Sequence, residues 1–118
     1  MSLTFNSKTY TADSFAQNAV GYVGAAKSVS SKDDLILRRT APKPTSTLSG
    51  VGRTEAKLTR TVVLTGALTP TWDLIVDVSV SVPVGVASAD VDAALNDVGA
   101  LVSSASFKTH VKAQQINY

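Results

Sequence analysis

The charged side chains of this sequence are unevenly distributed, and they give the first indication of a binding surface. Between Leu35 and Gly66 there are six basic residues and a single acid, Glu55. The basic residues are Arg38, Arg39, Lys43, Arg53, Lys57 and Arg60. Between Thr71 and Val98 there are five acids and no base. Clustered cationic groups attract polyanions, so the pattern favours a polyanion-binding surface, with ordinary solvated charge as the alternative.

Residue types that carry catalysis or bind metals are scarce. The chain has no cysteine and one histidine, His110. These counts exclude disulfides, thiolate metal sites, a cysteine nucleophile and any site built from several histidines. There is no P-loop, no G-x-G-x-x-G and no G-x-S-x-G motif, and the later acids are not spaced as a metal cluster. We therefore expect no enzyme activity, no metal, no cofactor and no small-molecule substrate.

Length and hydropathy point to one globular domain without a membrane segment. A chain of 118 residues, 44% hydrophobic and 17% charged, can build one modest core. Residues 1–10 lack the apolar segment of a secretory signal. The longest nearly uncharged stretch, Val78–Ala89, is too short and too rich in serine to cross a bilayer. These features favour a protein made in the cytosol.

The basic and hydroxyl residues lie on segments with the two-residue alternation of β-strands. In Trp72–Val82, the even-numbered residues from Leu74 onwards are all apolar, and this is the clearest strand. The complete set of expected strands is Leu3–Asn6, Lys8–Thr11, Ser14–Ala26, Leu35–Thr40, Thr54–Thr65 and Trp72–Val82. We expect the first two to form a hairpin and the third to be bent or bulged.

After Gly85 the apolar spacing becomes helical. The apolar positions are Val91, Ala94, Leu95, Val98, Leu101 and Val102. They predict an amphipathic helix over Ala89–Ser103 with Ser88 as its N-cap. A second, shorter helix is expected over Phe107–Gln114, capped by Ser104 or Ser106.

These elements define an α+β fold in which an antiparallel sheet of five to six strands, opening with a hairpin, is followed by two C-terminal helices. We expect one domain, residues 1–118, with the hairpin and sheet in 1–83 and a helical arm in 88–114. One side of the sheet is apolar, whereas the other carries Arg38, Lys57, Thr59, Thr61, Ser79 and Ser81. Such a platform suits phosphates and splayed bases, with a merely solvated surface as the alternative.

The strand edges favour association of two chains. A long, Val-rich strand with few charges is an association hazard when its edge is open. Pairing two copies edge to edge removes that edge and extends the polar platform. The residues themselves therefore predict a homodimer.

The order and length of the elements resemble the coat proteins of single-stranded RNA bacteriophages of the levivirus type. The most persuasive stretch is TWDLIVDVSVSVPVGVASADVDAALNDVGALVSS, residues 71–104, in which an alternating strand ends at proline and a short link leads into an amphipathic helix. LILRRTAPKP (residues 35–44), SFAQNAVGYV (residues 14–23) and the tail QQINY are also similar to the family pattern. The resemblance covers nearly the whole chain.

The resemblance implies an interlocked dimer with one continuous sheet, in which each chain's helical arm packs on its partner. It further implies that dimers self-assemble into a quasi-equivalent icosahedral capsid, with the polar side of the sheet against the viral RNA. Localisation in the virion follows, after synthesis in the bacterial host cytoplasm. Many members also repress translation by binding an RNA hairpin, so translation regulation is a further implication.

The resemblance also implies the RNA-contacting positions: alignment on Trp72 and Pro83 assigns those of the last strand, and the others fall on the two strands that neighbour it in the family. The RNA-binding residues that it implies are Arg38, Thr40, Lys57, Thr59, Thr61, Asp77, Ser79 and Ser81. Ile75 stands where some relatives have a base-stacking aromatic residue, and Asp77 adds a negative charge. Both departures weaken the case for the familiar hairpin-binding mode, although not for general contact with the genome.

Some alternatives remain open from the sequence. A small RNA-binding or translation-regulating homodimer that forms no shell fits the same residues. An extracellular adhesion subunit fits the Val and Thr content, but the absent signal segment argues against it. The pattern does not assign the facing of Arg39, Lys43, Arg53 or Arg60, and pairing of Arg39 and Arg60 with acids of a partner's helix is one interpretation.

Overall fold

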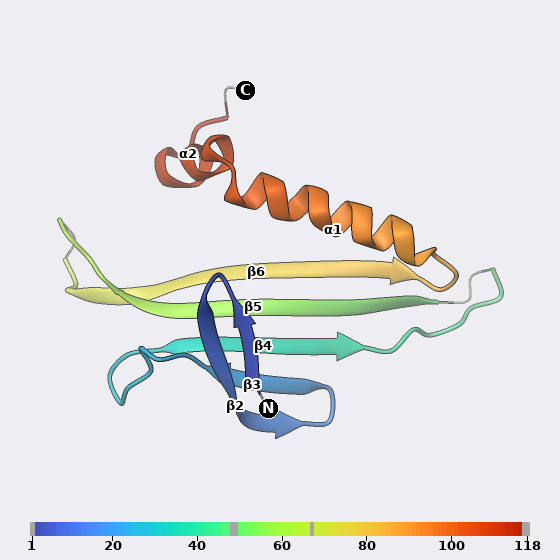
Figure 1. Ribbon diagram of the computed structural model, residues 1–118, viewed down its shortest axis with the longest axis horizontal. Helices are drawn as coiled ribbons and strands as arrows, with labels where there is room; N and C mark the ends of the chain where they lie inside the picture. The colour runs from blue at the N-terminus through green and yellow to red at the C-terminus, as the bar shows by residue number, and fades with distance from the viewer. Residues whose placement is uncertain (1, 48–49, 67, 117–118) are drawn as a thin grey trace. The chain divides into compact units, whose positions relative to one another are not determined.

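The computed structural model describes residues 2–47, 50–66 and 68–116. In these residues the chain forms one six-stranded antiparallel sheet, in the order β1 to β6, followed by helices α1 and α2 (Figure 1). A boundary between Val84 and Gly85 divides the chain into two compact units, one with the sheet and one with the helices. The predicted fold class, with its hairpin, sheet and two C-terminal helices, is confirmed.

The strand and helix bounds follow the predicted order. The strands are β1 (Ser2–Phe5), β2 (Lys8–Ala16), β3 (Ala19–Val23), β4 (Asp33–Thr40), β5 (Val51–Val63) and β6 (Thr71–Pro83). The helices are α1 (Ser88–Ser103) and α2 (Ala105–Ala113). The two longest strands, β5 and β6, pair along their whole length.

The N-terminal hairpin turns at Asn6 and Ser7. Both residues have positive φ angles, 50° and 60°, the backbone that a tight two-residue hairpin requires. The prediction of a single bent strand over Ser14–Ala26 is wrong, because β2 continues to Ala16 and a two-residue turn leads into β3. That turn, Gln17–Asn18, contains neither glycine nor proline, so the sequence marks it weakly.

A small core lies beneath the N-terminal hairpin. The register of β2 shifts between Ala12 and Ser14, and in Figure 1 the residues before this bulge cross over the other strands together with β1. Tyr10 is the most buried side chain, at 1% exposed, and it packs with Tyr22 and Leu35. The hairpin thus covers part of one side of the sheet.

The helical unit confirms both predicted helices and corrects one cap. Ser88 is the first residue of α1 and not its N-cap; Ala87 holds that position and makes no side-chain capping bond. Ser104 is the N-cap of α2, because its hydroxyl accepts a hydrogen bond from the Phe107 amide at 3.2 Å. No residue of either helix is buried.

Candidate nucleic-acid interface

The register of β4, β5 and β6 decides which side chains share a side of the sheet. Directly paired residues point the same way, and alternate residues along a strand do so too. Ladder pairs therefore define rows that run across the three strands. One side, here called the polar face, has the rows Thr40–Arg53–Ser81, Arg38–Glu55–Ser79, Ile36–Lys57–Asp77, Asp34–Thr59–Ile75 and, on β5 and β6 alone, Thr61–Asp73.

All eight residues implied as RNA contacts lie on this polar face. Each of the five rows contains at least one of them, so the structure brings the whole set together. Ile75, which is 53% exposed, lies in the same row as Thr59. The predicted alternation on β4, β5 and β6 is therefore confirmed, whereas the contact with RNA stays a prediction.

The sequence assignment missed several charged residues of the polar face. Arg53 was left unassigned because the expected strand began at Thr54, but β5 begins at Val51 and Arg53 lies between Thr40 and Ser81. Glu55 and Asp73 were also omitted, although they share odd numbering with Lys57 and Ser79. Carrying the two-residue period to both strand ends finds all three.

Ion pairs neutralise much of the polar face. Lys32 contacts Asp73 at 3.1 Å, Lys27 contacts Asp34 at 3.1 Å, and Arg38 contacts Glu55 at 3.3 Å. Asp73 also accepts a hydrogen bond from the Thr61 hydroxyl at 3.0 Å. The hydrogen bonds from Lys32 and Thr61 hold the pKa of Asp73 below its ordinary value, because they favour the charged carboxylate.

The remaining charges make the two ends of the polar face different. In the middle row, Lys57 lies directly across from Asp77. At the end where β4 stops, Arg38 and Arg53 are accompanied by Glu55 alone. We call this the arginine end, and we call the opposite end, with Lys32 and Asp73, the lysine end. Among the described residues of the polar face, only the arginine end has more cations than acids.

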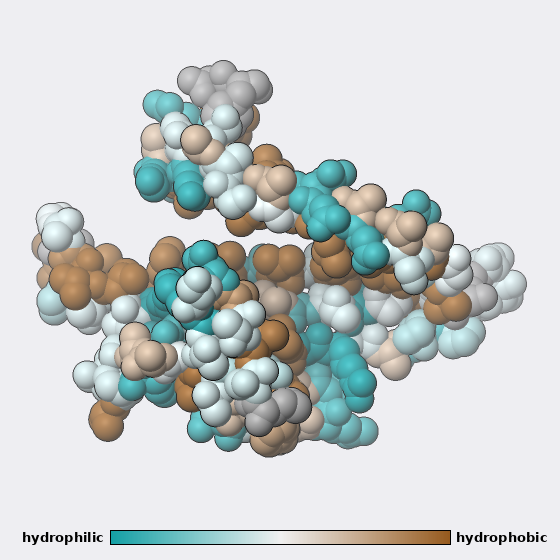
Figure 2. Space-filling view, viewed as in Figure 1, coloured by the Kyte–Doolittle hydropathy of each residue, from teal (hydrophilic) through white to brown (hydrophobic). Residues whose placement is uncertain are grey.

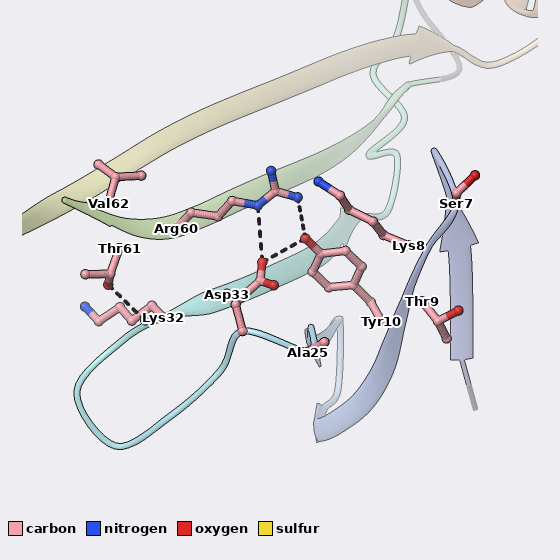
Figure 3. A pocket seen from close by; sticks show the side chains of 11 residues that line it. Ser7, Lys8, Thr9, Tyr10, Ala25, Lys32, Asp33, Arg60, Thr61 and Val62 are labelled. Atoms are coloured by element: carbon pink, nitrogen blue, oxygen red, sulfur yellow. Dashed lines mark hydrogen bonds and ion pairs between the residues drawn. The ribbon is translucent and has the colours of Figure 1, made fainter.

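The other side of the sheet, here called the apolar face, carries Leu35, Leu37, Leu58 and the even-numbered residues of β6 from Trp72 to Val82. Arg60 lies on this face and not on the polar one. Its Nη2 donates to the Tyr10 hydroxyl at 2.6 Å and its Nε donates to Asp33 at 3.3 Å (Figure 3). The interpretation that Arg60 pairs with a partner's helix is replaced by this contact within the chain.

The cluster of Tyr10, Asp33 and Arg60 ties the hairpin to β4 and β5. The Tyr10 hydroxyl donates to Asp33 at 2.8 Å, so each of the three side chains bonds the other two. Burial raises the pKa of Tyr10, because the phenolate would lose its hydration. A cavity of about 540 Å³ opens beside the cluster, with Lys8 and Lys32 among its lining residues.

The described residues contain no group of three or more His, Cys, Asp or Glu side chains that could hold a metal ion. Within the same residues, neither helix is long and apolar enough to cross a membrane.

The structure resembles subunits of phage particles over almost its whole length. It matches the virus-like particle of Beihai levi-like virus 32 with a TM-score of 0.81 and 14% identity, covering 96% of this chain and 91% of that one. The match to the virus-like particle of bacteriophage GQ-907 has a TM-score of 0.77, 14% identity, and 99% and 90% coverage. The match to the virus-like particle of bacteriophage AVE019 has a TM-score of 0.76 and 16% identity, and it covers 100% of this chain and 96% of that one.

No protein-family model matches the sequence, and no curated protein matches it either. The likeness is therefore one of structure, and at these identities it defines the fold. The fold is that of the small subunits that build levi-like phage particles. More particularly, it is the levi-type coat-protein fold, which confirms the expected resemblance at the level of the fold.

Proposed function

We propose that this chain is the coat subunit of a single-stranded RNA bacteriophage. It forms a homodimer, the dimers assemble into a closed icosahedral shell, and the polar face lines the interior against the viral RNA. The virion is then its location, after synthesis in the bacterial host cytoplasm. The observation that carries the proposal is the match to subunits of virus-like particles over nearly the full chain.

Exposed apolar surface on both units supports dimerisation. On the apolar face, Trp72 is 66% exposed, Leu74 52% and Val76 44%. Figure 2 shows hydrophobic side chains at the surface of the sheet unit. In α1, the apolar residues Leu95, Val98, Leu101 and Val102 are exposed as well. Such contiguous apolar surface marks an interaction site, and a helical arm, residues 88–114, laid on the sheet of a second copy covers both surfaces together.

The edge of β6 supports the same arrangement. Among the described residues β6 pairs only with β5, so one edge of a 13-residue strand is open. Antiparallel pairing of two such edges satisfies their backbone groups and joins the two polar faces into one surface. We therefore propose a continuous sheet through paired β6 strands.

Contact with the genome on the polar face follows from its side chains. Single-stranded RNA offers phosphates to cations and unstacked bases to hydroxyl groups, and the polar face presents both. Ile75 has no ring to stack on a base and Asp77 repels phosphate, so we propose general contact with the genome as the main role. Repression of translation through one specific hairpin has less support from these two residues.

Expression of the chain alone in bacteria tests the proposal. We expect negative-stain microscopy of the purified protein to show closed particles, with RNA inside that resists nuclease. Free monomers without nucleic acid would contradict it. Small RNA-bound dimers with no particles, seen by light scattering, would instead support the alternative of an RNA-binding homodimer that forms no shell.

A further inference from the structure

The cavity beside the Tyr10–Asp33–Arg60 cluster has the size of a small-molecule site. Its volume of about 540 Å³ lies within the range of such sites, about 300–1,000 Å³. Its walls come from the hairpin turn with the start of β2, the loop between β3 and β4, and the facing ends of β4 and β5 (Figure 3). All of these segments belong to one chain, so the cavity forms without a second copy and without RNA.

The lining of the cavity contains more cations than acids. Its charged members are Lys8, Lys32, Arg60 and Asp33. Lys8 takes part in none of the four ion pairs of the described residues, and its ladder partner on β1 is the apolar Phe5. Lys32 contacts Asp73, but that carboxylate is not part of the lining. The surplus of positive charge favours an anionic ligand.

The one acid of the lining is occupied, whereas the arginine beside it keeps free donors. Asp33 is buried, and its Oδ1 accepts hydrogen bonds from the Tyr10 hydroxyl at 2.8 Å and from Arg60 Nε at 3.3 Å. Arg60 is half-buried and also donates from Nη2 to the Tyr10 hydroxyl. A guanidinium has five N–H donors, and these two bonds leave the others outside the contacts of the described residues. The cluster thus fixes Arg60 in place with donors to spare.

The uncharged part of the lining leaves room for an apolar group. Apart from Tyr10, it consists of alanines, a valine and hydroxyl residues, namely Ser7, Thr9, Ala25, Ala26, Thr61 and Val62. Gly24 precedes the two alanines, and a Cβ at this position would clash with the Asp33 carboxylate and crowd the Tyr10 ring. Glycine therefore lets the loop pass close to the cluster, and the alanines after it form one wall of the cavity.

We propose that this cavity binds a small organic anion, with its carboxylate or phosphate group held by Lys8 and Arg60. Both side chains donate charge-assisted hydrogen bonds to oxyanions, and a guanidinium can donate two side by side. Ligand sites combine a few placed polar groups with apolar walls, so Ala25, Ala26 and Val62 favour an apolar body beside the anionic group. The site lies apart from the arginine end, and it does not rest on the proposed coat function.

Isothermal titration calorimetry of the purified protein, in chloride buffer at constant ionic strength, tests the site. The probe is phenyl phosphate, and benzoate and inorganic phosphate are its comparisons. We expect saturable binding of one phenyl phosphate per chain and weaker binding of inorganic phosphate, which lacks the apolar part. The ratio of the affinities for phenyl phosphate and benzoate shows which anionic group the site prefers.

Two variants should weaken binding of phenyl phosphate by different means. Lys8→Ala removes a hydrogen bond to a charged group and should weaken binding about tenfold or more. Ala25→Leu keeps every charge but fills part of the cavity, and it should weaken binding as well. Thermal unfolding checks that each variant is folded, and if one variant does not fold, the other decides the test.

Two control variants should bind phenyl phosphate as the wild type does. Lys27→Ala changes a lysine of the same loop that is paired with Asp34 and lies outside the lining. Arg53→Ala changes a cation of the arginine end. A wild-type protein that does not bind the probe, or an affinity unchanged in a folded Lys8→Ala or Ala25→Leu variant, overturns the site. Loss of binding in Arg53→Ala does so too, because the anion would then lie on the polar face. Particle formation is scored separately, so the site and the coat function fail independently.

Discussion

Each of the two faces of the sheet carries an ion pair between an arginine and a carboxylate, and the two pairs differ in how far they are buried. On the apolar face, the Arg60–Asp33 ion pair lies under the hairpin, with side-chain exposures of 32% and 11%. On the polar face, the Arg38–Glu55 pair has the same length, 3.3 Å, but exposures of 50% and 33%. The two pairs differ in burial and not in length, so we expect the loss of one partner to destabilise the fold more at the buried pair than at the exposed one.

The largest expected effect is the contrast between substitutions at two adjacent residues of β6, one on each face of the sheet. Val78 lies on the apolar face and Ser79 on the polar face. We expect Val78→Asp to abolish dimers and particles, because a carboxylate would be buried where a second copy packs. Ser79→Asp should still assemble but contain less RNA, because it adds a negative charge beside Arg38 and Arg53. Light scattering measures assembly, and the ultraviolet absorbance ratio of the product measures its RNA content. Loss of assembly in Ser79→Asp would contradict the assignment of assembly to the apolar face and of RNA contact to the polar face.

The two ion pairs themselves give the next largest effect. Arg60→Ala leaves Asp33 and Tyr10 without their guanidinium partner in a mostly buried setting, and we expect a loss of about 1–3 kcal/mol in the free energy of unfolding. Arg38→Ala removes an exposed pair and should cost about 0–1 kcal/mol. Urea denaturation of the two variants measures the difference. Equal losses would show that the hairpin cluster does not anchor the fold.

The pH dependence of stability should also differ between the faces. The raised pKa of Tyr10 means that its contribution is complete below about pH 10 and is lost as the pH rises through the folded value. The lowered pKa of Asp73 means that its contribution is present above about pH 4 and is lost as the pH falls through the folded value. Melting temperatures across the pH range should therefore show a smaller alkaline loss in Tyr10→Phe and a smaller acid loss in Asp73→Asn. If the pH dependence of the melting temperature were the same in both variants as in the wild type, Tyr10 and Asp73 would not contribute to the pH dependence of stability.

The smallest expected effect concerns the middle row of the polar face. Asp77→Asn removes the carboxylate opposite Lys57 and should tighten RNA binding by up to about fivefold. A fivefold change in affinity corresponds to about 1 kcal/mol, which is the upper end for an exposed charge pair. Titration of a fluorescent oligouridine with the purified protein measures it. Weaker binding in this variant would indicate that Asp77 itself accepts hydrogen bonds from RNA bases.

The alternation of β4, β5 and β6 was predictable from sequence because one side of each strand is apolar and the other is not. The same pattern placed all eight implied contact residues on one side. It missed Arg53 because hydrophobicity does not mark where β5 begins: Val51 and Gly52 precede Arg53 and look like part of the preceding connection. It missed the turn at Gln17–Asn18 because the turn contains no strong breaker.

The hairpin cluster could not be found in the same way. Arg60 bonds a tyrosine 50 residues earlier, and this tyrosine lies on the part of β2 that precedes the bulge between Ala12 and Ser14. No local pattern marks such a contact. Arg60 lies between Leu58 and Val62 on the apolar face of β5, and a charge in an apolar row is a sign of a partner, but the sequence alone does not show which residue that partner is.

Cryo-electron microscopy of the assembled protein at residue resolution tests the central claim most directly, because one map shows what covers each face. We predict a closed shell in which the β6 strands of two copies pair, α1 of each copy lies on the apolar face of the other, and RNA density lies against the polar face, strongest at Arg53. A map in which α1 covers the β6 strand of its own chain, or in which RNA density lies on the hairpin side, would contradict this account.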